Sequence, residues 1–195
     1  SNEYLNSNDC SQHNEIENKL DNFLNQNKIP HLMFYGNYGC GKKTIINNFL
    51  NKLYKNIDHK ERENYIMKIN CGYGKGIKFV REDIKFFAKT NINCRNGLFK
   101  TILLYNADKL TIDAQSALRR CIELFSCSTR FIITAHDKSK ILKPILSRFC
   151  SIYLPNPTNE NLKLINYHEI KISKITTSSH NQKNQTLKTM LNSFL

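Results

Sequence analysis

The sequence predicts an α/β fold in which helices cover a parallel β-sheet. Between residues 31 and 154, apolar runs typical of buried strands alternate with stretches of helical hydrophobic periodicity. A glycine-rich segment joins the first of these strands to the first of these helices. Of the 195 residues, 40% are hydrophobic, which is enough to fill the core of one ordinary domain.

The strands and helices can be placed in chain order from their patterns. Residues 1–12 are polar and are expected to be disordered or loosely packed, and a helical stripe follows at Ile16, Leu20, Phe23 and Leu24. Strands are expected at 31–35, 65–71, 101–105, 130–135 and 151–154, and helices at 42–56, 77–90 and 111–125. Because strands and helices alternate, the five strands are expected to form one parallel sheet.

Two of these helices carry a single apolar face. In the helix at 111–125 this face consists of Ala114, Ala117, Leu118, Cys121, Ile122 and Phe125. In the helix at 77–90, the residues expected to face inward are Ile77, Val80, Ile84 and Phe87, which leaves Lys78, Arg81 and Lys85 outside.

Two prolines, Pro155 and Pro157, mark the expected end of this domain, which we place at residues 13–155. Residues 156–195 are expected to form a partial helical lid and a flexible tail. Thr158 is suited to begin a helix over 158–172. The run 173–186 is rich in Ser, Thr, Asn, Gln and Lys, which is typical of a flexible segment.

The charge and the cysteines restrict the kind of protein. The net charge is +13, which favours polyanionic partners and nucleic acid first, although an AT-rich genome also enriches Lys and Asn. The 7 cysteines include no C-x-x-C pair, so neither zinc nor any other metal site is predicted. Scattered free thiols, with no signal peptide and no apolar stretch long enough to span a membrane, indicate a reducing, intracellular location.

The glycine-rich segment at 36–44 has the composition of a phosphate-binding loop. Its glycines let backbone N–H groups turn toward a polyphosphate, and the following helix start adds partial positive charge. The preceding strand and the following helix favour a nucleotide site over a turn with chance spacing. The residues expected to bind ATP or ADP are Gly36, Gly39, Cys40, Gly41, Lys42, Lys43 and Thr44.

Three positions, in two motifs, argue against Mg²⁺ and against efficient hydrolysis. The Ser or Thr that usually follows the loop lysine and holds the metal is replaced by Lys43. The acidic pair expected at the end of the strand at 101–105 is replaced by Tyr105 and Asn106. Asp108 comes three residues after the first acidic position and is expected to cap the next helix.

In these motifs and around them, the chain resembles the small subunits of replication factor C, the AAA+ clamp loaders that open sliding clamps on DNA. The resemblance covers about residues 14–157. It is carried by the segments 70–85, 104–123, 131–136, 139–142 and 144–148. The G-K-K-T end of the loop is similar to the family subunit that lacks a working ATPase site.

The resemblance implies a three-layer AAA+ domain with a helical lid, acting in DNA replication. It implies that Arg148 is an arginine finger for a neighbouring subunit and that Lys78, Arg81, Lys85 and Lys140 follow the DNA backbone. The implied partners are other clamp-loader subunits, the sliding clamp and primer-template DNA. The implied location is the nucleus if the protein is eukaryotic, or the replication site of a host cell if it is viral.

Other residues have two interpretations. Arg119 and Arg120 either line the subunit interface or form a solvated helix face. Ile92, Leu98 and Phe99 either touch the clamp or pack under their own loop.

The chain also departs from the family pattern. His136 stands at the polar sensor position, and Phe149 takes the place of the cysteine in S-R-C. The family's N-terminal adenine-binding element is absent, and the collar that closes its ring does not fit into 195 residues.

Three alternative functions stay open. One is an active ATPase in which Thr44 and Asp108 bind the metal. Another is a non-enzymatic DNA or clamp adaptor. The third is another AAA+ replication factor, such as an origin-binding protein.

Overall fold

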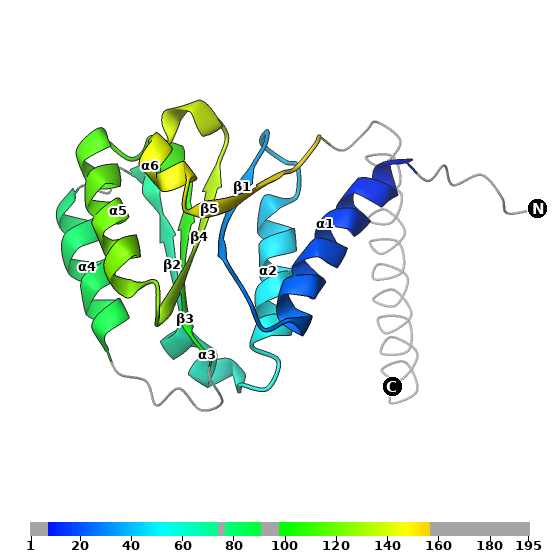
Figure 1. The fold of residues 1–195 in the computed structure, drawn as a ribbon, viewed down its shortest axis with the longest axis horizontal. Coiled ribbons are helices and arrows are strands. Elements are labelled where there is room, and N and C mark those ends of the chain that lie inside the picture. Colours follow the sequence, from blue (N-terminus) through cyan, green and yellow to red (C-terminus); the bar gives the residue numbers. More distant parts are fainter. Residues whose placement is uncertain (1–7, 74–76, 91–97, 157–195) are drawn as a thin grey trace, which may run out of the picture. The chain divides into compact units, whose positions relative to one another are not determined.

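The computed structural model describes residues 8–73, 77–90 and 98–156 (Figure 1). The chain divides into two compact units, residues 1–156 and 157–195, and every described element belongs to the first. The predicted partial helical lid, the helix at 158–172 and the flexible run at 173–186 therefore lie outside the described residues. Within the part of the chain that is described, no helix has the length and apolar character needed to cross a membrane.

The centre of the domain is a five-stranded sheet with the order β2-β3-β4-β1-β5, in which all neighbours are parallel. The strands are β1 (His31–Tyr35), β2 (Ile66–Asn70), β3 (Lys100–Tyr105), β4 (Thr129–Ala135) and β5 (Phe149–Tyr153). The central strands β3 and β4 are almost entirely buried, as expected when helices cover both faces of a parallel sheet. The predicted fold class is confirmed.

Helices cover the sheet on both sides, which gives three layers. Figure 1 shows α4 and α5 on one face and α1 and α2 on the other. The helices are α1 (Asn8–Asn25), α2 (Lys42–Leu53), α3 (His59–Tyr65), α4 (Ile77–Lys89), α5 (Ile112–Phe125) and α6 (Lys143–Leu146). Short 3-10 helices are η1 (Cys71–Tyr73), η3 (Ala107–Lys109) and η4 (Lys138–Lys140).

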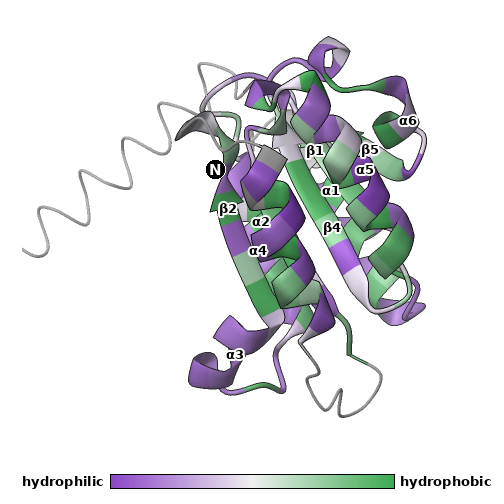
Figure 2. Cartoon of the chain, turned by 90° about the vertical axis from the view of Figure 1, so that its left-hand side faces the viewer, coloured by the Kyte–Doolittle hydropathy of each residue, from purple (hydrophilic) through white to green (hydrophobic). Residues whose placement is uncertain are grey.

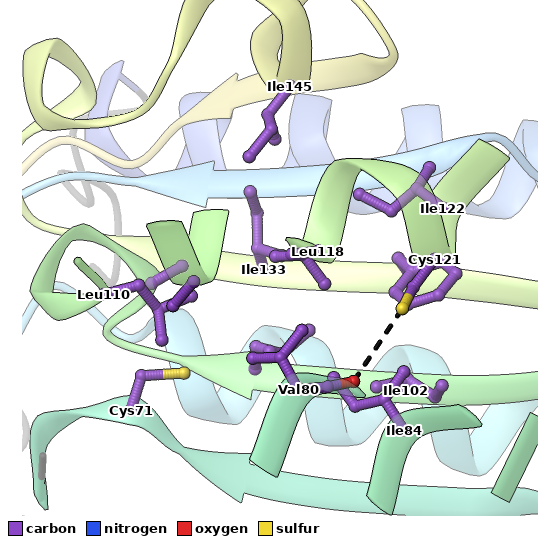
Figure 3. Packing of buried hydrophobic residues seen from close by; sticks show 14 of the residues in the cluster. Cys71, Val80, Ile84, Ile102, Leu110, Leu118, Cys121, Ile122, Ile133 and Ile145 are labelled. Carbon is purple, nitrogen blue, oxygen red and sulfur yellow. Dashed lines mark hydrogen bonds between the residues drawn. The ribbon is translucent and has the colours of Figure 1, made fainter. Parts of the chain in front are cut away.

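The alternation of strand side chains builds one core on each face. On the α4–α5 side, sheet residues such as Ile102 and Ile133 pack with Val80, Leu118 and Ile122, as Figure 3 shows. On the other side, Leu103 and Ile132 pack with residues of α1 and α2. Figure 2 shows hydrophobic residues along most of β4, and a mixture of hydrophobic and polar residues on the helices. The predicted apolar faces are confirmed where described, and the side chain of Ile77 lies outside the description.

Several predicted boundaries are wrong. Helix α1 begins at Asn8, inside the segment expected to be disordered or loosely packed, and residues 1–7 lie outside the described residues. Helix α2 ends at Leu53 rather than at residue 56. Helix α3 was not predicted because its sequence, HKERENY, is polar on most sides and gives no periodic signal.

Candidate nucleotide site

The glycine-rich loop at 36–44, here called the phosphate loop, lies where three strands end side by side. The strand order places β1 next to β4 and β4 next to β3, so their carboxyl ends meet at one edge of the sheet. A cavity of about 410 Å³ opens there. It is lined by the phosphate loop from Tyr38 to Thr44 and by Tyr105, Asn106, Thr134 and His136.

Two glycines fix the path of the loop. At Gly36, φ is 151° and an added Cβ would lie 2.3 Å from the carbonyl oxygen of Leu154, so no side chain fits. Gly41 has φ 87°, a left-handed conformation that glycine adopts without cost, and it begins α2. No side chain caps this helix start and its first turn holds no acidic residue, which leaves its positive end directed toward the cavity.

The lysine of the loop is folded inward. Lys42 is only 8% exposed. Its Nζ donates hydrogen bonds to the carbonyl oxygens of Gly36 at 2.7 Å and Asn37 at 2.6 Å, and it lies 3.4 Å from the Sγ of Cys40. A buried ammonium therefore sits inside the loop, where it adds positive charge to the helix start.

The positions that hold a metal in proteins of this fold carry the wrong chemistry for Mg²⁺. The Nζ of Lys43 lies 5.2 Å from the centre of the Tyr105 ring. Burial raises the pKa of Tyr105, so its phenol stays protonated at neutral pH. These residues offer an ammonium and a neutral phenol, whereas Mg²⁺ requires oxygen ligands with negative charge or free lone pairs. The residues present do not fit the metal.

A polar network continues from the cavity to the edge of the sheet. The Nδ2 of Asn106 donates to the Oδ1 of Asn70 at 2.9 Å, and its backbone N–H donates to the Oγ1 of Thr134 at 3.0 Å. The Oδ1 of Asn106 lies 3.1 Å from the Nε2 of His136. Because the amide oxygen can only accept, this contact assigns the proton to Nε2. Asn106 adopts φ 56° to make these contacts, a conformation that asparagine tolerates.

The surroundings of His136 favour its neutral imidazole form. Burial, and next the charge of Lys42, lower its pKa. Its Nδ1 is buried with no hydrogen-bond partner. The ring of Tyr38 stacks on it with the centroids 3.4 Å apart, although Tyr38 itself is 74% exposed. The sensor position predicted at His136 therefore lies in the wall of the cavity.

Asp108 does not have the predicted role of a helix cap. The cap of α5 is Thr111, whose Oγ1 accepts from the N–H of Ala114 at 3.3 Å. Asp108 lies in η3, is 7% exposed and has a buried Oδ1 without a partner. It does not line the cavity.

The predicted arginine finger, Arg148, lies outside this cavity, directly before β5. Its Nη2 is 2.5 Å from the Oε1 of Glu123 on α5, and the Nε of Arg119 is 3.0 Å from the same oxygen. The hydrogen bond from Arg119 is the largest cause that lowers the pKa of Glu123. Glu123 was not among the predicted site residues. The i, i+4 spacing from Arg119 was the available signal.

The residues predicted to bind DNA are divided between two places. Arg81 and Lys85 line a second cavity of about 480 Å³ together with Arg120 and the acidic Asp113 of α5. Lys78 is exposed on α4 and Lys140 is exposed in η4, and neither lines this cavity. The structure therefore brings three basic side chains together and leaves two of the predicted four apart.

Of the apolar residues predicted in the loop at 91–99, Leu98 and Phe99 pack against the core on the α1–α2 side. The Phe99 ring centre also lies 4.9 Å from the guanidinium carbon of Arg130. The structure therefore favours packing under their own loop, and Ile92 lies outside the described residues.

Comparison with known proteins agrees with this architecture. A family profile described as DNA polymerase III, delta subunit, matches residues 12–158. The replication factor C small subunit of Staphylothermus marinus is 37% identical over 139 residues, which are 71% of this chain and 40% of that protein. Human replication factor C subunit 5 is 34% identical over 177 residues, which are 90% of this chain and 51% of that protein. The chain thus spans about half the length of such relatives or less.

Solved structures show the same fold at lower sequence identity. A DNA polymerase III gamma subunit-related protein of Thermotoga maritima superposes with a TM-score of 0.57 at 15% identity, covering 80% of this chain and 49% of the other. The RuvB Holliday junction branch migration motor of the same organism gives 0.52 at 16% identity, covering 73% and 44%. The fold is thus that of AAA+ P-loop proteins. With the family match over residues 12–158, the chain belongs to the clamp-loader family of the DNA polymerase III delta subunit and the replication factor C small subunits.

Proposed function

We propose that this chain is a clamp-loader subunit that binds ATP or ADP with little or no hydrolysis and supplies Arg148 to the ATP site of a neighbouring subunit. One observation carries the proposal. The phosphate loop keeps its glycines and a buried Lys42, while Lys43 and Tyr105 occupy the metal positions.

Nucleotide binding is supported by the geometry of the loop. The cavity is bounded by the uncapped start of α2, whose N–H groups can donate to a phosphate. Lys42 presently donates to two carbonyl oxygens of its own loop, and a phosphate would offer it a charged acceptor instead. A bound nucleotide would also stabilise the fold, by about 2.7 kcal/mol at a ligand concentration one hundred times the dissociation constant.

Weak or absent hydrolysis is supported by the lack of a base at the end of β3. Asn106 has no proton-accepting carboxylate, and both ends of its amide are used by Asn70 and His136. The alternative of a rebuilt metal site at Thr44 and Asp108 has little support, because Asp108 does not line the cavity. Thr44 alone offers a single hydroxyl.

A role in trans is supported by the position of Arg148. It lies outside its own cavity and keeps its guanidinium half-exposed on the surface. A planar, permanently charged group of this kind can stabilise charge on a phosphate held by another subunit. The non-enzymatic adaptor differs from this proposal in one respect, since there Arg148 would not affect the ATPase of a partner.

DNA and clamp binding are proposed from the family and from the charge. The second cavity gathers Arg81, Lys85 and Arg120 on the α4–α5 surface, where the backbone of primer-template DNA could lie. Lys78 and Lys140 would extend this basic surface. The sliding clamp and further clamp-loader subunits would be the protein partners, at the replication site of the cell.

The decisive experiment measures ATP binding and hydrolysis by the purified chain with Mg²⁺, with and without primed DNA. We expect binding without turnover in both conditions. Turnover that Lys42→Ala abolishes would mean that this subunit is an active ATPase. In a reconstituted complex, Arg148→Ala is expected to lower the ATPase activity of the neighbouring subunit, and no effect would favour the adaptor.

A further inference from the structure

We infer that the ammonium group of Lys43 takes the place of the metal ion, so that this site binds a nucleoside di- or triphosphate in its metal-free form. The inference rests on the proposed nucleotide binding and specifies which ionic form of the ligand the site accepts. It assigns Lys43 as the residue that determines this specificity.

The position of Lys43 carries the first step. It is the second residue of α2, next to Lys42, and its side chain lines the same cavity as Tyr105 at the end of β3. The Nζ of Lys43 lies 5.2 Å from the Tyr105 ring centre. This ammonium therefore lies between the helix start and the strand end, the two elements that share a metal ion in proteins of this fold.

The chemistry around Lys43 carries the second step. A ring face attracts a cation, so Tyr105 stabilises the ammonium on the cavity side. Burial raises the pKa of Tyr105, and its neutral phenol would not replace the carboxylate that a metal needs. Asn106 stands at the second position of the missing acidic pair. Its amide oxygen accepts a hydrogen bond from His136, and its amide nitrogen donates one to Asn70. A divalent cation would thus meet a positive charge and no anionic ligand at these positions.

The charge balance carries the third step. Lys42 and Lys43 bring two positive charges to the same cavity, and each has a flexible stem that allows its ammonium to follow phosphate oxygens. A phosphate chain bound by both has two of its negative charges balanced without a metal. Magnesium in solution complexes the free nucleotide, so it should compete with the lysines for the same oxygens. We therefore expect metal-free nucleotide to bind as tightly as the magnesium complex or more tightly.

The test is calorimetric titration of the full chain with ADP and ATP, in EDTA and in excess Mg²⁺, at matched ionic strength. The wild type should bind in EDTA with an affinity equal to or higher than that in Mg²⁺. Lys43→Ser should weaken binding in EDTA about tenfold, the value of one charge-assisted hydrogen bond. The control Lys55→Ser removes an exposed lysine that does not line the cavity and should leave both affinities unchanged.

A second test restores the missing metal ligands. The triple variant Lys43→Ser, Tyr105→Asp, Asn106→Glu restores a hydroxyl and two carboxylates, and its binding should become dependent on Mg²⁺. Thermal melting without ligand checks that each variant is folded.

The results separate this inference from the proposed function. Wild-type binding at least tenfold weaker in EDTA than in Mg²⁺ would overturn the inference while nucleotide binding stands. An unchanged affinity of Lys43→Ser in EDTA would also overturn it. If the wild type binds no nucleotide in either condition, the proposed nucleotide site itself fails, and the inference fails with it.

Discussion

The guanidinium of Arg148 lies 2.5 Å from the carboxylate of Glu123 within the same chain. Arg119 pairs with the same oxygen at 3.0 Å, so one carboxylate serves two arginines. In the isolated chain the charge of Arg148 is therefore partly neutralised. An arginine that acts on a phosphate in a neighbouring subunit has to exchange this carboxylate for the phosphate.

Replacing Glu123 with Gln should therefore strengthen the action of Arg148 in trans. The pKa of Glu123 is held low, mainly by the hydrogen bond from Arg119, so the competing charge is present at neutral pH. We expect the ATPase activity of the neighbouring subunit in a reconstituted complex to rise a few-fold. Glu82→Gln, an exposed carboxylate on α4, is the control. A fall in activity would identify Glu123 as a positioning residue that holds Arg148 in its working orientation.

Lys42→Met should weaken nucleotide binding at least tenfold and leave the fold intact. The methionine keeps most of the volume of the side chain but removes the only buried ammonium of the described loop. Each charged hydrogen bond to a phosphate that is lost should cost about 1.5–3 kcal/mol of binding free energy. Calorimetry should show at least a tenfold weaker affinity for ADP. Lys60→Ala, on the surface of α3, should bind like the wild type. Unchanged binding by Lys42→Met would place the phosphates elsewhere.

Nucleotide affinity should decrease as pH rises from the lowered pKa of free His136 toward its higher pKa in the complex. Burial and Lys42 lower the pKa of His136 in the free protein. Phosphates bound in the same cavity would bring negative charge and raise it, so binding would take up a proton and be favoured at lower pH. In His136→Asn this contribution should disappear. The nucleotide titrates equally with both proteins, so the difference between their pH profiles isolates His136. Superimposable pH profiles of nucleotide affinity for the wild type and His136→Asn would contradict the assignment of this pH dependence to His136.

Fold stability should fall as the solution is acidified below pH 6.5, in part because of His31. Burial, and next the charge of Arg130, lower the pKa of His31 to about 4, while its Nδ1 accepts a hydrogen bond from the N–H of Phe131 at 3.0 Å. Between these two pKa values the unfolded chain binds the extra proton. The stabilisation is thus complete above about pH 6.5 and is lost toward pH 4.

The expected loss from His31 is about 1–2 kcal/mol in total, after discounting for partial solvent exposure. Urea denaturation of the wild type and of His31→Gln between pH 4 and pH 7 measures it. The variant should be less stable at pH 7 and should change less with pH. Parallel curves would assign the acid sensitivity to other groups.

DNA binding should depend on the basic cavity between α4 and α5. Arg81→Ala should weaken the binding of primed DNA. It should also reduce the salt dependence of the DNA affinity by about one released counterion. Lys55→Ala, away from this surface, should change neither. An unchanged salt dependence of DNA binding in Arg81→Ala would show that the DNA binds to another face of the domain.

How far the sequence predicted the molecule depends on the kind of signal. Strands such as β3 and the core face of α5 were predictable, because burial imposes a periodicity that can be recognised locally. The phosphate loop was predictable because glycine and lysine positions follow from the backbone conformation. Helices α3 and α6 were missed, since one is polar and the other has only 4 residues.

The contacts of the site could not be predicted in the same way. The pairing of Glu123 with Arg148 joins residues 25 positions apart, and no local pattern encodes that distance. The stack of Tyr38 on His136 depends on where two strands end relative to each other. Asp108 followed a local rule, the preference of aspartate for helix starts, and that rule failed because Thr111 stands closer to the start of α5.

The close approach of Gly36 to Leu154 couples two distant parts of the chain mechanically. The N–H of Leu154 donates to the carbonyl oxygen of Tyr35 at 2.9 Å, and the N–H of Gly36 donates to Ala135. These hydrogen bonds tie the first residue of the phosphate loop to the end of β4, and the residue that follows β5 to the end of β1. The fluorescence of a dye attached at the neighbouring, exposed Tyr153 position should therefore change when a nucleotide binds to the phosphate loop, although the dye does not contact the nucleotide.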